Sequence, residues 1–164
     1  MTTPVAAMTN AKLGVDGKRM VAEGQYKRGK SFVGAAILLR QNGGCEFVVL
    51  YLLLQGIENV LKGLLLYIDY ETYKPMLKKS IGHNLLKLTA EAAEAAGLSP
   101  LRPALRDEVD SLNTLYSKHI LRYSSTYDIF VNPSTIQSRR VFYRIGALLR
   151  LVERKGLVGG CYAI

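Results

Sequence analysis

The chain has 164 residues, the length of one domain, and 49% of them are hydrophobic, which excludes a disordered protein. Lysine and arginine number 22 against 13 acidic residues, and the formal charge of +9 favours acidic partners such as nucleic acid. Two cysteines and two histidines are too few for a disulfide framework, a cysteine-built zinc site or a histidine-rich metal site, so we expect no metal and no cofactor. Cys45 and Cys161 lie far apart, and the N-terminus lacks the apolar core of a secretory signal, which favours a cytoplasmic protein.

Two long helices are expected in the first half of the chain. Residues 1–17 show no periodicity and are expected to form a flexible N-terminal arm. Lys18–Gln41 carries apolar residues at helical spacing, and Asn42–Gly44 then breaks the pattern. Cys45–Tyr70 is rich in leucine and apolar on nearly every side, which predicts a buried central helix. Its longest unbroken apolar run, Phe47–Leu54, is too short for a membrane span.

Three shorter helices are expected in the second half, each from apolar residues three or four positions apart. They are Ile81–Ala96, Ala104–Tyr123 and Ile136–Lys155. Thr72–Ser80 contains Pro75 and three lysines and is predicted to be a loop, and Ser124–Thr135 is predicted to be an irregular connection.

The five expected helices predict an all-α protein, an up-and-down bundle that comprises residues 18–156, with residues 157–164 as a C-terminal tail. The apolar faces of the helices can be buried only against one another. The second helix is apolar on so many sides that it must be central or be covered by a second subunit, and we expect a homodimer.

Gly24–Ser31 matches the phosphate-loop pattern G-x-x-x-x-G-K-[ST]. In that motif, backbone N–H groups wrap the phosphates, Lys30 would neutralise charge and Ser31 would bind magnesium. A phosphate loop follows a buried strand, whereas Lys18–Glu23 is mostly charged and small. A coincidental match inside a basic helix is therefore favoured over an NTPase.

Charged side chains of the second and third expected helices form another candidate site. Glu58 and Lys62 are four residues apart, the spacing at which helical side chains form an ion pair, and a structural salt bridge is the simplest role for them. His83 lies in the first turn of the next expected helix, where a lone histidine is more often a packing or capping residue than a catalyst. Because Lys78 and Lys79 precede it, the three side chains together form a candidate phosphate site.

Four stretches of the chain, between about Lys18 and Tyr123, resemble the HEPN superfamily, named for nucleotide-binding proteins of higher eukaryotes and prokaryotes. They are GKSFVGAAILL (Gly29–Leu39), the polar residues Gln55, Glu58 and Lys62, GHNLLKL (Gly82–Leu88) and LNTLYSKHILRY (Leu112–Tyr123).

The resemblance implies an α-helical bundle, often dimeric, from a bacterial or archaeal toxin–antitoxin or defence locus. Many such proteins are metal-independent ribonucleases with an R-x(4–6)-H motif, in which arginine positions phosphate and histidine acts as base or acid. No arginine stands at that spacing before His83 or His119, and Lys78 occupies a matching position instead. A member that binds RNA or a nucleotide without cleaving it is therefore favoured, and other relatives pair with a nucleotidyltransferase.

The last expected helix places Arg140, Arg144, Arg150 and Arg154 on one side. Such a face is most often simply solvated, but the basic last third of the chain favours a stripe that binds phosphate. Contact with anionic lipid ranks lower, because the apolar face of this helix has one bulky aromatic residue, Phe142, and we expect no membrane partner.

We therefore expect a cytoplasmic, HEPN-like protein that binds RNA or a nucleotide. The residues expected to contact phosphate are Lys78, Lys79, His83, Asn84, Arg122, Arg140 and Arg144, with Glu58 and Lys62 organising the site. Three alternatives stay open: a metal-independent ribonuclease that uses His83 with Lys78, an NTPase that uses Gly24–Ser31, and a bundle that only binds another protein.

Overall fold

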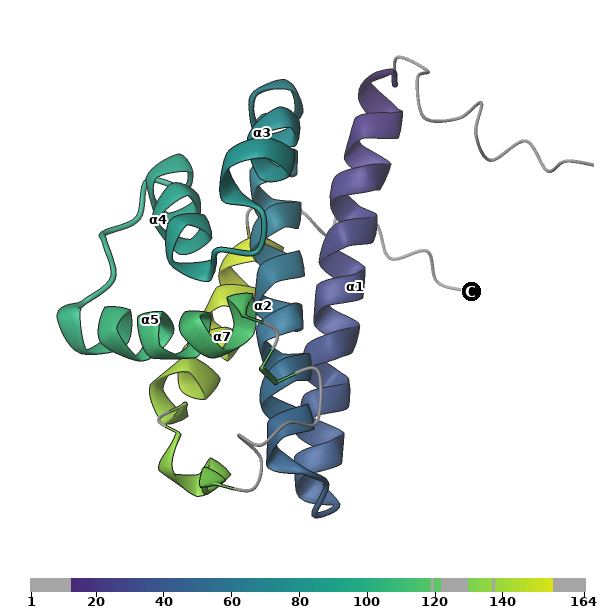
Figure 1. Cartoon of the computed structure of the whole chain (residues 1–164). Coiled ribbons are helices and arrows are strands. Elements are labelled where there is room, and N and C mark those ends of the chain that lie inside the picture. The colour runs from purple at the N-terminus through teal and green to yellow at the C-terminus, as the bar shows by residue number, and fades with distance from the viewer. Residues whose placement is uncertain (1–12, 119, 122–129, 137, 155–164) are drawn as a thin grey trace, which may run out of the picture.

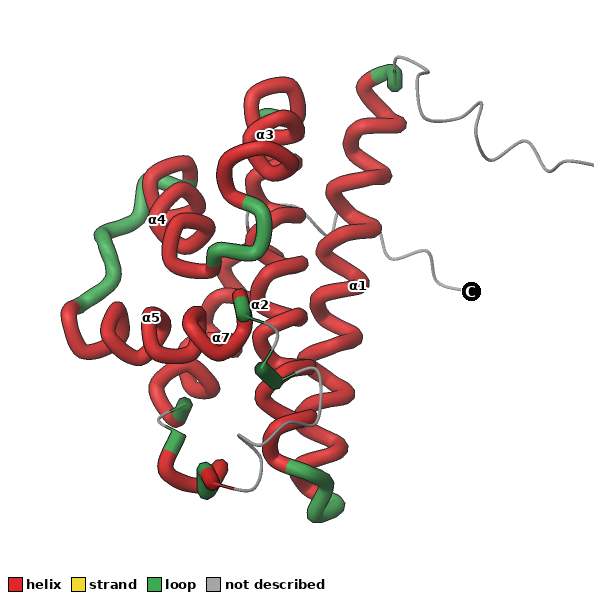
Figure 2. Tube along the Cα trace, in the orientation of Figure 1, coloured by secondary structure: helices red, strands yellow, loops and turns green. Residues whose placement is uncertain are grey.

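The structure, a computed structural model, describes residues 13–118, 120–121, 130–136 and 138–154 (Figure 1). Every regular element in these residues is helical and none is a strand (Figure 2). The all-α prediction is therefore confirmed for the described part of the chain. The elements are α1 (Val15–Gln41), α2 (Glu46–Ile68), α3 (Tyr70–Met76), a π-helical turn (Leu77–Ile81), α4 (Leu85–Ala95), α5 (Pro103–Ser117), a 3-10 turn (Pro133–Thr135) and α7 (Arg139–Val152).

α1 and α2 form a long antiparallel hairpin whose backbones nearly touch (Figure 1). A Cβ atom built on Gly29 would lie 2.6 Å from the backbone nitrogen of Val60, and one on Gly63 would lie 2.9 Å from that of Tyr26. Gly56 meets Val33 and the Gly29 carbonyl in the same way. Because glycine has no side chain, the two helix axes come closer here than leucine or valine would allow.

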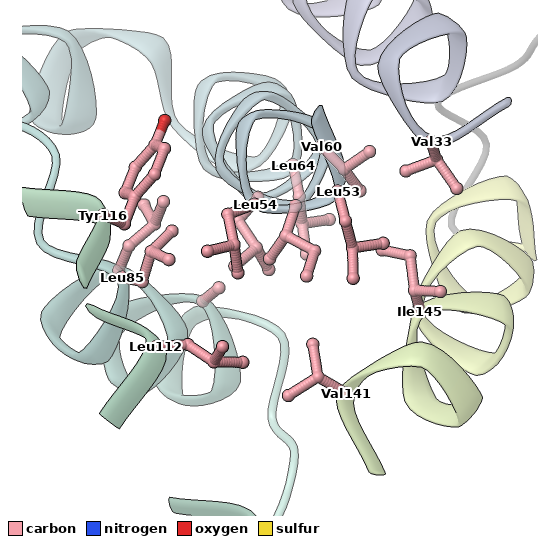
Figure 3. Close-up of a cluster of buried hydrophobic side chains, with 14 of the residues drawn as sticks. Val33, Leu53, Leu54, Val60, Leu64, Leu85, Leu112, Tyr116, Val141 and Ile145 are labelled. Carbon is pink, nitrogen blue, oxygen red and sulfur yellow. The ribbon is translucent and has the colours of Figure 1, made fainter. Parts of the chain in front are cut away.

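α2 is the central element, as its composition predicts. Its buried residues face α1 on one side and α4, α5 and α7 on the other. Figure 3 shows Leu54 and Leu64 of α2 among Leu85 of α4, Leu112 of α5 and Val141 of α7. By length and composition α2 could cross a membrane, but 72% of its most apolar window is buried inside the protein, as in the core helix of a soluble bundle.

The prediction of a loop at Thr72–Ser80 is wrong, because this segment is helical. Asp69 starts α3: its carboxylate accepts a hydrogen bond from the Thr72 backbone N–H at 3.1 Å and another from the Thr72 hydroxyl at 2.7 Å. Pro75 lacks an N–H and so removes one helical hydrogen bond, but it does not end the helix. The chain continues through the π-helical turn to Gly82, whose φ of 57° reverses its direction.

Several predicted boundaries also differ. The first helix begins at Val15, so residues 15–17 are not part of an arm, and the third begins at Leu85 rather than Ile81, because the Asn84 side chain caps it. α5 begins at Pro103 and ends at Ser117, and α7 begins at Arg139. α5 also runs across α2, so the up-and-down arrangement holds for the α1–α2 pair but not for α5 (Figure 1). Residues 122–129 and the expected tail, 157–164, lie outside the described part.

Candidate functional site

One carboxylate, that of Glu58 on α2, joins three parts of the fold. Its side chain is only 5% exposed, and it accepts a hydrogen bond from Lys62 Nζ at 2.6 Å. The Tyr116 hydroxyl of α5 donates to the second carboxylate oxygen at 2.5 Å. His83 Nδ1, from the turn before α4, lies 3.0 Å from both oxygens. We call these four residues the Glu58 cluster.

The Glu58 carboxylate is ionised at neutral pH. Burial raises its pKa, but hydrogen bonds from Lys62, Tyr116 and His83 outweigh burial and hold the pKa below the usual value for glutamate. An ionised carboxylate can only accept hydrogen bonds, so His83 Nδ1 must donate. In the neutral imidazole ring, the other nitrogen, Nε2, is then the basic atom.

The fold fixes His83 on the surface at this end of the cluster. Gly82 turns the chain just before it, and Asn84 just after it caps α4 by accepting the Lys87 N–H at 2.9 Å. The Asn113 side chain of α5 also accepts the N–H of Leu85 at 2.8 Å, which ties the start of α4 to α5. The His83 side chain is 57% exposed. Its imidazole is therefore oriented by the protein and accessible to a ligand.

The lysines of the predicted site fall into two groups. Lys78 and Lys79 lie in the π-helical turn and are exposed, a few residues before His83. Lys62 is only 14% exposed and is bound to Glu58, so the predicted ion pair is present and serves the packing of α2. Asn84 uses its side-chain oxygen for the cap of α4, which is a structural role that the sequence analysis did not assign to it.

The predicted arginines lie elsewhere. Arg140 and Arg144 line a groove among α2, α4, α5 and α7, and no residue of the Glu58 cluster, nor Lys78 or Lys79, lines it. Arg140 also contacts the buried carboxylate of Glu108 at 3.4 Å. Arg122 is outside the described residues. The described residues that were expected to contact phosphate therefore lie in two separate regions.

The phosphate-loop match is a segment of helix. Gly24–Ser31 lies in the middle of α1, where backbone N–H groups are used by the helix itself and cannot wrap a phosphate. Gly29 is in contact with α2, and Tyr26 and Lys30 both donate hydrogen bonds to Glu153, at 3.0 and 2.9 Å. These bonds hold the pKa of the Glu153 carboxyl below its usual value. The motif residues thus connect α1 to the end of α7, and the segment does not form a phosphate loop.

Sequence reasoning missed two polar residues that the fold buries. Tyr116 has helical spacing with Leu112, which places it on the buried face of α5, but nothing in the pattern shows that its hydroxyl meets Glu58. Figure 3 shows that hydroxyl directed away from the apolar cluster. Glu108 accepts the Val141 N–H at 2.8 Å and so satisfies the first turn of α7. The signal available for Glu108 was its spacing of about one helical turn from apolar residues of α5, which places this acidic side chain beside the buried face of the helix.

The described residues hold no group of three or more histidine, cysteine or acidic side chains placed to bind a metal ion. The charged and polar groups described above are an oriented imidazole with two lysines nearby in the chain, and a separate arginine-lined groove. Comparisons with family models, with curated proteins and with solved structures found no match.

Proposed function

We propose that this protein is a HEPN-like helical bundle that binds RNA or a nucleotide through phosphate groups. The surface that holds phosphate consists of Lys78, Lys79 and His83, which we call the His83 surface. One observation carries the proposal: the buried Glu58 carboxylate fixes an exposed imidazole directly after a turn that bears two exposed lysines.

The charge of this part of the chain supports an anionic ligand. Residues 72–90 hold four lysines and no acidic residue, and the Glu58 carboxylate, which contacts His83, is buried. Phosphate is attracted by such a cationic surface, and an imidazole that is already oriented loses little entropy on binding. The HEPN resemblance, which includes Gly82–Leu88, points to the same region.

The test is a titration of single-stranded RNA at several salt concentrations, read by fluorescence anisotropy. Binding should weaken as salt rises, because lysines that contact phosphate release counterions. The Lys78→Ala/Lys79→Ala variant should bind more weakly, with a slope of log affinity against log salt reduced by about 1.4 if both lysines contact phosphate. Lys27→Ala/Arg28→Ala removes the same charge from exposed positions of α1 and should keep the wild-type slope. If both variants behave alike, the site is not at the His83 surface.

A second function, metal-independent RNA cleavage, is favoured by the contact between Glu58 and His83. With Nδ1 directed at the carboxylate, Nε2 is the ring nitrogen that would exchange a proton with a ribose hydroxyl or a leaving oxygen, as a general base or acid does. Lys78 would hold the phosphate, although an ammonium group makes fewer fixed contacts than a guanidinium group.

This second function has its own test. RNA should be cleaved in the presence of a chelator, and His83→Ala should abolish cleavage while Glu58→Gln lowers it. Lys78→Arg restores the arginine spacing and should raise the rate about tenfold, whereas Lys79→Arg makes the same replacement out of register and should not. If the wild-type protein binds RNA but never cleaves it, the cleavage function is refuted and only the binding function remains.

The proposal includes a homodimer in the cytosol, encoded near a nucleotidyltransferase, as the resemblance implies. The mostly buried α2 is in keeping with a cytosolic bundle. Sedimentation of the purified chain measures whether it is a homodimer. A monomer at micromolar concentration would contradict the dimer.

A further inference from the structure

A groove of about 1750 Å³ opens among α2, α4, α5 and α7, away from the His83 surface. Leucine and isoleucine side chains of α2, such as Leu54, Ile57 and Leu61, lie at its floor and are at most 7% exposed. The upper walls carry apolar side chains that reach solvent, including Leu98, which is 41% exposed. Pockets for small molecules usually enclose about 300–1,000 Å³, so this groove is suited to a larger occupant.

The rim of the groove is strongly basic. Six arginines line it and only one acidic residue, Glu108, does so; the arginines are Arg40, Arg102, Arg139, Arg140, Arg144 and Arg150. Arg40 pairs with Glu46 at 3.4 Å, and Arg140 pairs with Glu108. Among the described residues, the other four form no salt bridge. Apolar walls between cations that form no salt bridge fit an occupant that is apolar on one face and acidic beside it.

The chain itself does not supply such an occupant. Residues 1–12, 122–129 and 155–164, which the structure does not describe, contain a single acidic residue, Asp128. A second copy of the chain carries a net charge of +9, so its approach to this rim is opposed by repulsion. RNA would contact the arginines and would find aromatic planes in Phe142 and Tyr143, but the aliphatic side chains of the groove offer its bases no planar partner.

We propose that this groove binds an acidic amphipathic helix of a partner protein, in the helix-in-groove mode. The lining follows α7 from Arg139 to Leu151, which at 1.5 Å per residue is about 18 Å, or three turns of a bound helix. Apolar side chains three and four positions apart on that helix contact the partly exposed apolar walls of the groove, which include Leu98, Leu105 and Leu148. Aspartate and glutamate on its flanks pair with Arg102, Arg144 and Arg150.

The experiment uses three labelled synthetic peptides of about 14 residues and the full-length protein. The first has leucines at helical spacing and glutamates beside them, the second has the same residues in scrambled order, and the third has lysine in place of glutamate. We expect the first peptide to bind at least about tenfold more tightly than the other two. Only this peptide presents both an apolar helical face to the apolar side chains of the groove and acidic side chains to the arginines of the rim.

Two variants locate the binding. Arg144→Glu/Arg150→Glu should weaken the acidic peptide about tenfold or more and strengthen the lysine peptide. Ala147→Trp places a large side chain in the groove from an exposed position, so it should block both peptides without unfolding the protein. Arg28→Glu, on an exposed part of α1, is the charge control and should bind as the wild type does, and circular dichroism melting checks that each variant folds.

Three results would overturn the proposal. The first is equal affinity for the helical and scrambled acidic peptides. The second is unchanged peptide binding by Ala147→Trp. The third is a different occupant: RNA or phosphatidylglycerol vesicles whose binding is lost in the groove variants and which displace the peptide. The RNA function stands or falls separately, because it is measured with Lys78→Ala/Lys79→Ala.

Discussion

The two faces of α2 are packed in different ways. Toward α1, glycines bring the backbones together, and a Cβ on Gly29 or Gly56 would meet atoms of the opposite helix at 2.6 Å. Toward α4, α5 and α7, leucines and one buried carboxylate hold the helices farther from α2, and a groove remains. Close backbone packing leaves no room for a ligand, so both candidate sites lie on the looser face.

The largest expected effect comes from a substitution that disrupts the Glu58 cluster, on the face of α2 toward α4, α5 and α7. Glu58→Ala leaves Lys62 nearly buried without its acidic partner and removes the hydrogen-bond acceptor of Tyr116. Removing one partner of a buried ion pair costs about 3 kcal/mol or more, and we expect the free energy of unfolding to fall by that amount. Urea unfolding measures it. Glu94→Ala, at an exposed position of α4, should change stability by less than about 0.5 kcal/mol.

The next effect tests the close-packed face. In Gly29→Ala the new Cβ meets the Val60 backbone, which cannot rotate away, and we expect a loss of about 2–3 kcal/mol. Gly34→Ala is the matched control, because a Cβ there has no neighbour within 4 Å. That variant should gain about 0.5–1 kcal/mol from a better helix former. Equal outcomes for the two glycines would contradict the close approach of α1 and α2.

A smaller effect concerns the joint between α5 and α7. Glu108→Ala leaves the Val141 N–H without an acceptor in a buried position, and the cost should be about 1–2 kcal/mol. Asp110→Ala, on the exposed side of the same helix, should be close to neutral. Thermal melting compares the two variants, and a midpoint that moves equally in both would remove the capping role of Glu108.

The smallest effect is a dependence on pH. The pKa of Glu58 is lower in the folded protein than in the unfolded chain, so its contribution to stability is complete above the unfolded value of about 4.3. That contribution is lost as pH falls through the lower, folded value. Glu58→Gln should therefore show a shallower loss of stability below about pH 5 than the wild type in urea unfolding. Glu94→Gln is the control, and a slope unchanged in Glu58→Gln would contradict the lowered pKa.

Helical spacing predicted where the helices lie in the chain, but it did not predict which side chains contact one another in the folded protein. It located α1, α2, α4, α5 and α7 within a few residues, because periodicity records which face is buried. It failed at Thr72–Ser80, where Pro75 and the lysines led to the prediction of a loop, whereas Asp69 caps a helix there. It also suggested a phosphate loop at Gly24–Ser31, since a letter pattern does not reveal that Gly29 is a helix contact.

The candidate site was predicted only in part. The Glu58–Lys62 pair follows from a spacing of four residues, because both side chains belong to one helix. The partners His83 and Tyr116 lie 25 and 58 residues away from Glu58, and no local pattern could name them.

The sequence by itself determined that this protein is helical, that α2 is central and that the last third of the chain is basic. These properties follow from composition and local spacing, which need no knowledge of the other helices. Only the tertiary structure decided that Glu58 meets His83 and that the arginines surround a groove apart from the lysines. The reason is that distances between helices depend on which side chains separate them, and glycine on one face of α2 and leucine on the other set those distances.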